Sequence, residues 1–195
     1  YVAGFCTATT LQFVDSSNVA TQLWTSGSSS NVIQNANVLA LDLVTGEYLW
    51  LTVLESFAAA QGPVFAAPGS GAFSLAFATG GLPTIAGSYT GILENLPFYL
   101  PPATYQQLGL VMAFDPQSGA PVWGRWIGSN YGESSAYAIA AFTTSPNTEP
   151  PNAVGLVVGG LFSYGTASLD CSVNVFSDRV DVWLAALVPT PPDVP

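Results

Sequence analysis

Histidine and lysine are both absent from the 195-residue sequence, and Arg125 and Arg179 are its only basic residues. Without histidine the chain has no imidazole for general acid–base catalysis, for a Ser-His-Asp triad or for metal binding. Twelve acidic residues give a formal net charge of −10. A surface of that sign repels phosphate groups, so we expect neither nucleic acid nor an anionic membrane surface as a partner.

Charged residues of either sign are scarce: they make up 7% of the sequence, against 49% for hydrophobic residues. The mean hydropathy is correspondingly high, at +0.42. A surface with few charges is weakly protected against association, which favours a protein that assembles with copies of itself. No uninterrupted apolar run approaches the ~18 residues of a membrane-spanning helix, so we expect no membrane span.

Cysteine is also rare, with Cys6 and Cys171 the only two. They would form one disulfide bond in an oxidising compartment, and the alternative is two buried thiols. The sequence starts with Tyr1 instead of methionine. This start favours a processed or excerpted chain, such as a protein that has lost a signal peptide. We therefore expect an extracellular or cell-surface location.

One stretch of the sequence occurs twice. Residues 40–50 read ALDLVTGEYLW, and residues 113–123 read AFDPQSGAPVW, 73 residues later at every matched position. A third copy at 186–189 lacks the aspartate, and only seven residues follow Val188. Repetition at a fixed period indicates an array built from one supersecondary unit.

Each full copy has the features of a β-hairpin. An apolar run predicts a buried strand, and the aspartate that ends it can accept backbone N–H groups in the turn. The glycine supplies a positive φ, and the tryptophan of the next strand offers a ring that can bury roughly 150–250 Å² against a neighbouring unit. The matched positions are Asp42 and Asp115, Gly46 and Gly119, and Trp50 and Trp123.

A second recurrent element precedes each hairpin: a short apolar strand that leads into Gly4, Gly87 and Gly159. Together the two elements predict a single β-repeat domain over 1–188, with units of approximately 1–83, 84–155 and 156–188. The 15 prolines and 19 glycines are spread through the chain, which suits tight turns and disfavours long helices. We therefore predict an all-β fold with a proline-rich tail at 189–195.

These residues resemble the repeats of extracellular bacterial and archaeal β-propeller proteins, with a pattern of Val-Ala-Gly followed by Leu-Asp-x-x-Gly-x-x-x-Trp. The aspartate-to-tryptophan piece is similar to the tryptophan-docking motif of quinoprotein propellers. The resemblance implies tandem, blade-like antiparallel β units, each a four-stranded blade. It also implies that Trp50 and Trp123 are docking tryptophans that pack between adjacent blades.

The number of repeats departs from that family. The chain holds about two and a half repeats of 73 residues, whereas a propeller closes with at least about four blades. An incomplete unit leaves a strand edge and an apolar face that proteins normally cover. We therefore expect another chain or another segment to complete the array, by sharing a ring or by strand lending between subunits.

Candidate catalytic and metal-binding residues are few. Asp178 and Asp181 flank Arg179 in the densest charge cluster, and their oxygens are a candidate calcium site. The alternative is a solvated turn with a local ion pair. Two distant cysteines do not make a zinc site, and a quinone cofactor needs a closed ring with a polar centre. We expect no catalytic residue, no cofactor and no enzymatic activity of quinoprotein or glycosidase kind.

Aromatic residues are a candidate surface for glycans, since five tryptophans and eight tyrosines exceed what one small core needs. The alternative is packing in the core or at a subunit interface, where aromatics are enriched. The residues considered are Trp24, Tyr89, Tyr99, Tyr105, Trp126, Tyr131 and Tyr164.

The leading hypothesis from the sequence is a secreted, non-enzymatic structural subunit. It would self-assemble into an extracellular filament or sheath through β-strand contacts between subunits. The incomplete third repeat, the scarcity of charge and the proline-rich tail motivate it. The alternative is a propeller-type binding module, lectin-like or adhesin, of a larger surface protein.

Overall fold

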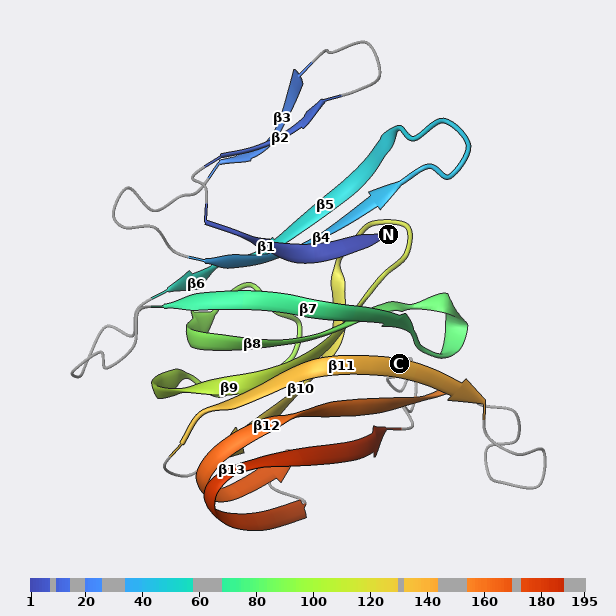
Figure 1. Cartoon of the computed structure of the whole chain (residues 1–195). Helices are drawn as coiled ribbons and strands as arrows, with labels where there is room; N and C mark the ends of the chain where they lie inside the picture. The colour runs from blue at the N-terminus through green and yellow to red at the C-terminus, as the bar shows by residue number, and fades with distance from the viewer. Residues whose placement is uncertain are drawn as a thin grey trace.

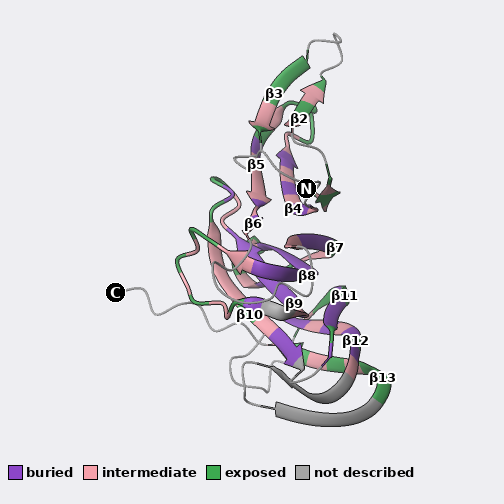
Figure 2. Cartoon of the chain, turned by 90° about the vertical axis from the view of Figure 1, so that its left-hand side faces the viewer, coloured by how far each residue is buried: buried purple, intermediate pink, exposed green. Residues whose placement is uncertain are grey.

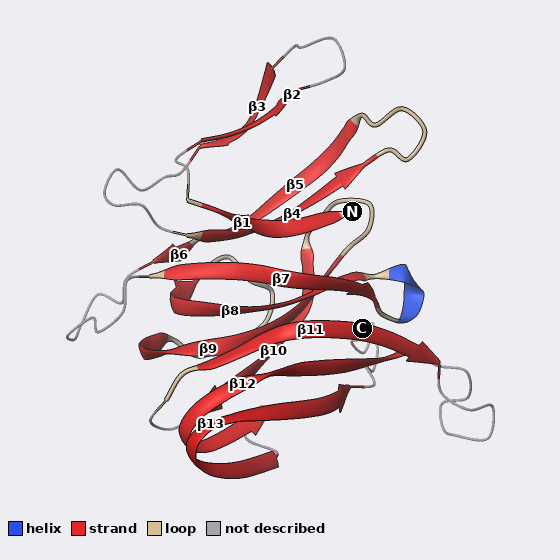
Figure 3. Cartoon of the chain, viewed as in Figure 1, coloured by secondary structure: helices blue, strands red, loops and turns tan. Residues whose placement is uncertain are grey.

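The computed structural model describes residues 1–7, 10–14, 20–25, 34–57, 68–129, 132–143, 154–169 and 173–187. As predicted, the fold is all-β: these residues form antiparallel strands, and their one helical element is the 3₁₀ turn η1 (Thr79–Gly81) (Figures 1 and 3). No helix in the described part of the chain is long and apolar enough to cross a membrane.

The strands form three sheets, and only the largest contains strands from more than two hairpins. A three-stranded sheet has the order β1-β4-β5, and β2 pairs with β3 alone. The third sheet has the order β11-β12-β10-β9-β8-β6, with β13 on β12 and β7 on β8. The strands are β1 (Val2–Cys6), β2 (Thr10–Val14), β3 (Ala20–Thr25), β4 (Asn35–Leu41), β5 (Tyr48–Leu54), β6 (Ser56–Phe57), β7 (Gly69–Phe77), β8 (Pro83–Leu93), β9 (Ala103–Phe114), β10 (Pro121–Ser129), β11 (Ser134–Thr143), β12 (Val154–Leu169) and β13 (Val173–Leu187).

Three strand pairs share one register: β1 with β4, β8 with β9, and β12 with β13. On the second strand of each pair, equivalent residues are 73 apart (39→112→185); on the first strand they are 83 and then 73 apart (2→85→158). The extra ten residues fall between β1 and β4, where the chain forms the β2–β3 hairpin. The equivalent pairs are Val2–Leu39, Ile85–Met112 and Val158–Ala185.

The common register also identifies the equivalent glycines. Gly4 lies opposite Asn37, and Gly87 lies opposite Leu110. In the third pair the same position is taken by Gly160, which lies one residue after the Gly159 suggested by spacing. The offset shows that pairing defines equivalence more sharply than the local motif does.

Two further strands stand on the other side of these pairs. β7 pairs with β8 and β11 pairs with β12, each with a register shift at an equivalent place (Ala72/Ser74 and Ala136/Ala138). The unit boundaries expected at 83/84 and 155/156 fall between these paired strands. Pairing instead groups the strands into a first unit (β1, β4, β5), a second unit (β7, β8, β9, β10) and a third unit (β11, β12, β13).

The hydrophobic core lies between consecutive units, in two clusters. The first joint, between the first and second units, contains Val38 together with Ile85 and Met112. The second joint, between the second and third units, contains Val111 together with Val158. Figure 2 shows buried residues concentrated in β4, β7, β8 and β9, and exposed residues along β2 and β3. No sheet of the described residues closes on itself.

Glycine is required where an inner strand approaches the first strand of its unit. A Cβ atom added to Gly87 would overlap the backbone oxygen of Gly71 in β7, and one added to Gly160 would overlap the backbone oxygen of Ser135 in β11. At Gly4 the nearest described atom is the Asn37 Oδ1, 4.0 Å away. The first unit therefore has open space where the other two hold an inner strand.

Alanine at Gly87 should therefore destabilise the fold much more than alanine at Gly4. The overlap at Gly87 is with backbone, which must shift, and such overpacking costs about 1–3 kcal/mol. At Gly4 the change adds no overlap, and the stiffer unfolded chain offsets part of any loss. Chemical denaturation of Gly87→Ala and Gly4→Ala measures both free energies of unfolding. Equal values would contradict this account of the inner strands.

Candidate functional site

The joint between the first and second units contains most of the residues that the repeat singles out. In the first unit the β4–β5 turn is held by Asp42, whose Oδ1 accepts the Val44 amide (2.9 Å), the Thr45 amide (2.7 Å) and the Thr45 hydroxyl (3.1 Å). The β9–β10 turn repeats this set, with Asp115 Oδ1 accepting the Gln117 amide (3.0 Å), the Ser118 amide (2.7 Å) and the Ser118 hydroxyl (2.8 Å).

These hydrogen bonds stabilise the ionised carboxylates. The backbone amide of Thr45 is the main group that lowers the pKa of Asp42 below its ordinary value, followed by the Val44 amide. The backbone amide and then the hydroxyl of Ser118 lower the pKa of Asp115 in the same way. Each aspartate therefore acts as the acceptor that shapes its own turn, and neither is placed as a general acid.

Trp50 of the first unit packs on the turn of the second unit. Its indole lies so close to Gly119 that an added Cβ atom would overlap the ring. The indole Nε1 donates to the backbone oxygen of Pro116 (3.0 Å), and the Thr52 hydroxyl donates to the backbone oxygen of Gly119 (2.6 Å). Tyr1 adds a second donor to the Pro116 oxygen (3.1 Å) and a ring 5.6 Å from that of Trp50.

The turn of the first unit has the same shape and no such cover. Gly46 has a φ of 71°, close to the 73° of Gly119, but no described atom lies within 4 Å of a Cβ added there. Leu43 and Val44 at the tip of this turn are almost fully exposed. The local bonds therefore form the turn whether or not a tryptophan packs on it.

Trp123 of the second unit is the counterpart of Trp50, and it packs against the second hydrophobic cluster. Its Nε1 is shielded from solvent and has no hydrogen-bond partner among the residues that the structure describes. The counterpart of the Pro116 acceptor, 73 residues further on, is Pro189. Pro189 lies outside the described residues.

A buried serine distinguishes the two joints in the same way. In the first joint the Ser70 hydroxyl accepts the Ala36 amide (2.8 Å) and donates to the Leu54 backbone oxygen (2.6 Å), so it ties β7 to the first unit. Its counterpart beside the second bulge, Ser134, is equally buried, and its hydroxyl has no partner within the described ranges. The first joint is thus the more completely hydrogen-bonded one.

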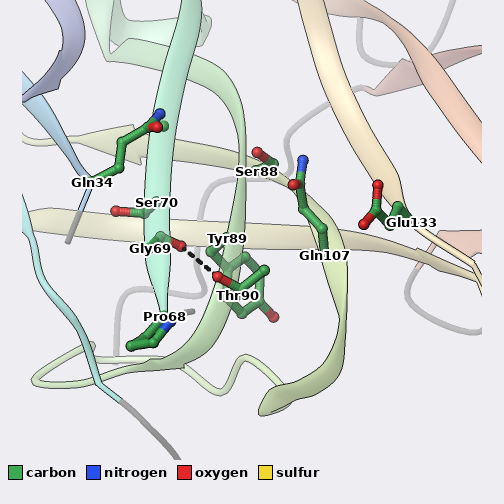
Figure 4. Close-up of a pocket in the computed structure, with 10 residues that line it drawn as sticks. Gln34, Pro68, Gly69, Ser70, Ser88, Tyr89, Thr90, Gln107 and Glu133 are labelled. Carbon is green, nitrogen blue, oxygen red and sulfur yellow. Dashed lines mark hydrogen bonds between the residues drawn. The ribbon is translucent and has the colours of Figure 1, made fainter. Parts of the chain in front are cut away.

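A cleft of about 280 Å³ lies beside the inner strand of the second unit (Figure 4). Polar groups from three elements line it, among them the Gln34, Ser88 and Gln107 side chains and the Glu133 carboxylate. Glu133 is the only carboxylate among the described lining residues, so the cleft offers no pair of acids for glycoside hydrolysis. Amide and hydroxyl groups of this kind suit a small neutral polar molecule.

An exposed row of aromatic rings crosses the inner strands near this cleft. Phe73 and Tyr137 occupy the two bulges and stack with ring centroids 5.1 Å apart, and Phe5 meets Phe73 edge-on at 6.5 Å. All three are exposed. The sequence analysis missed this row, and the only signal for it is the shared pattern Ser-x-Ala-aromatic at 70–73 and 134–137.

The aromatic residues considered for glycan binding are scattered. Tyr89 is buried, with its hydroxyl donating to the Pro101 backbone oxygen (2.8 Å), whereas Tyr99 is exposed. Trp24 and Trp126 are half-buried. The side chains of Tyr105, Tyr131 and Tyr164 lie outside the described residues.

The remaining predicted sites fall partly outside the described residues. Asp181 is exposed on β13, and the side chain of Asp178 is outside the described set, so the calcium site stays a prediction. No cluster of three or more potential metal ligands occurs within the described ranges. Cys6 is half-buried in β1, and Cys171 lies outside the described residues, so their pairing also stays a prediction.

Comparisons with protein-family models, with curated proteins and with solved structures find no match for this chain.

Alanine at Gly119 should cost more stability than alanine at Gly46. Both residues have a left-handed backbone, which costs a side chain about 1–2 kcal/mol. Only at Gly119 would the new methyl group also displace the Trp50 ring, which adds about 1–3 kcal/mol. Urea denaturation of the two variants measures the difference. The tryptophan contact would be unimportant if both lost the same free energy.

The aspartate turns also predict a dependence of stability on pH. Because the folded pKa of Asp115 is depressed, its stabilisation is complete above the unfolded value, near about 3.9, and is lost as the pH falls through the folded pKa. Asp115→Asn should therefore lose less stability on acidification than the wild type, with the largest gap between the two at neutral pH. Unfolding curves across the acid range test this, and parallel pH profiles would argue against it.

Proposed function

We propose that the protein is a secreted, non-enzymatic structural subunit that self-assembles into an extracellular filament or sheath through β-strand contacts. The observation that carries the proposal is the outer strand of the third unit, β13. Among the described residues β13 pairs with β12 alone. Its other edge presents a row of N–H and C=O groups with which a further strand can pair.

The side chains that β13 exposes are largely apolar. Val180, Val182 and Leu184 are 58%, 77% and 75% exposed. Edge strands of soluble proteins are usually protected by charges or bulges, but no charged residue occurs between Val182 and Leu187. Burial of Val182 and Leu184 in a contact would contribute about 1.5–3 kcal/mol each. A strand of this kind favours association.

We also propose that the three units are blades of a propeller-like array that another chain or segment completes. Three features support the blade arrangement: the common register, the position of each core between consecutive units, and the packing of Trp50 on the next turn. Within the described residues the first unit has no counterpart of β7, and the third has no counterpart of β10. Both outer units are thus short of one strand.

A binding role is the second candidate, and the aromatic row favours it. Phe73 borders Gly71, which lines the cleft, so stacked rings and neutral polar groups lie side by side. Sugars bind to such combinations of flat apolar and hydrogen-bonding surface. In this case the chain would be a lectin-like or adhesin module of a larger surface protein, and it would stay monomeric.

A lysine at Val182 should weaken assembly, because a charge would be desolvated at the contact. We expect an increase of at least about tenfold in the concentration required, which corresponds to about 1.4 kcal/mol. Size-exclusion chromatography with light scattering and negative-stain microscopy would follow wild type and Val182→Lys, with Tyr99→Lys as the control at an exposed loop position. A wild type that is monomeric at every concentration would contradict the proposed function and favour the binding module.

A further inference from the structure

The repeat allows one position to be compared in three surroundings. Val38, Val111 and Leu184 are equivalent residues on the middle strands β4, β9 and β13, each 73 residues after the last. Val38 and Val111 are both 0% exposed, because each packs against the unit that follows. Leu184 is 75% exposed, since no described unit follows the third. The outer face of the third unit therefore has the character of an uncovered joint.

The opposite end of the molecule shows the converse. Val2, Ile85 and Val158 are equivalent by register on β1, β8 and β12. Ile85 and Val158 are both 0% exposed, each in the cluster shared with the preceding unit. Val2 is 55% exposed, since no described unit precedes the first. Pairing places Val2, Leu39 and Leu51 in one row across the first sheet.

These two apolar faces lie on the first and last units, at opposite ends of the strand array (Figure 1). Inside the chain, a face of the Leu184 type packs against a face of the Val2 type twice, once at each joint. The occupant best matched to either free face is therefore the other free face, which only a second copy can supply.

We infer that copies bind head to tail, with the β13 face that carries Leu184 packed on the first-unit face that carries Val2 of the next copy. The inference rests on the proposed self-assembly and specifies its surfaces. Because the two faces differ, the contact is heterologous, and each bound copy leaves one free face of each kind. Growth then continues as a filament, or stops only when the copies close a ring.

The test uses two full-length variants, each blocked at one end: Val2→Asp and Leu184→Asp. A carboxylate in either apolar face must be desolvated on contact, so each variant alone should be monomeric under conditions where the wild type assembles. An equimolar mixture should form one-to-one dimers and nothing larger, since one good face of each kind remains. Sedimentation velocity measures the species, and Tyr99→Asp is the exposed control that should assemble like the wild type.

Each outcome decides a different point. If copies meet β13 to β13, Val2→Asp will still associate and mixing will produce no new species, which overturns the head-to-tail contact and leaves self-assembly intact. A monomeric wild type overturns both. Circular dichroism checks folding, and Leu49→Asp or Val182→Asp, on the same two faces, replaces a variant that does not fold. Assembly of both blocked variants at the wild-type concentration would also contradict the inference.

Discussion

The middle strand of the second unit is buried on both sides, and the rest of the structure follows from that constraint. Leu110 and Met112 pack against the first unit, whereas Val111 between them packs against the third. Successive side chains of a strand point to opposite faces, so a continuous apolar run makes a sheet that needs a neighbour on each side. Three units in a row form two joints, and one apolar face is left at each end.

The first joint combines apolar packing with hydrogen bonds at both of its margins. At one margin the Trp50 indole covers the turn at Gly119, and Pro116 accepts its N–H group. At the other, the Ser70 hydroxyl ties the inner strand to the first unit. The turns themselves need no such partner, since Asp42 holds an uncovered turn with the same bonds that Asp115 makes. Turn formation is thus local, whereas docking of the ring is a tertiary event.

The hairpins were predictable from sequence because their signals are local. An apolar run, an aspartate and a glycine with positive φ act within about ten residues, and the strands β4–β5 and β9–β10 form where these signals occur. The inner strands β7 and β11 escaped recognition as members of a unit. They are 64 residues apart instead of 73, because the connections around them differ in length, and their shared pattern of four residues is too short to stand out.

By itself the sequence determined the all-β class and the chemistry of its turns, because strand alternation and turn bonds depend on near neighbours. Only the tertiary structure decided which apolar positions are covered. Val111 and Leu184 are aliphatic residues at the same place in equivalent strands, yet Val111 lies in a core and Leu184 faces outward. The difference is the presence of a further sheet against the strand. That contact joins residues far apart in the chain, so no local pattern records it.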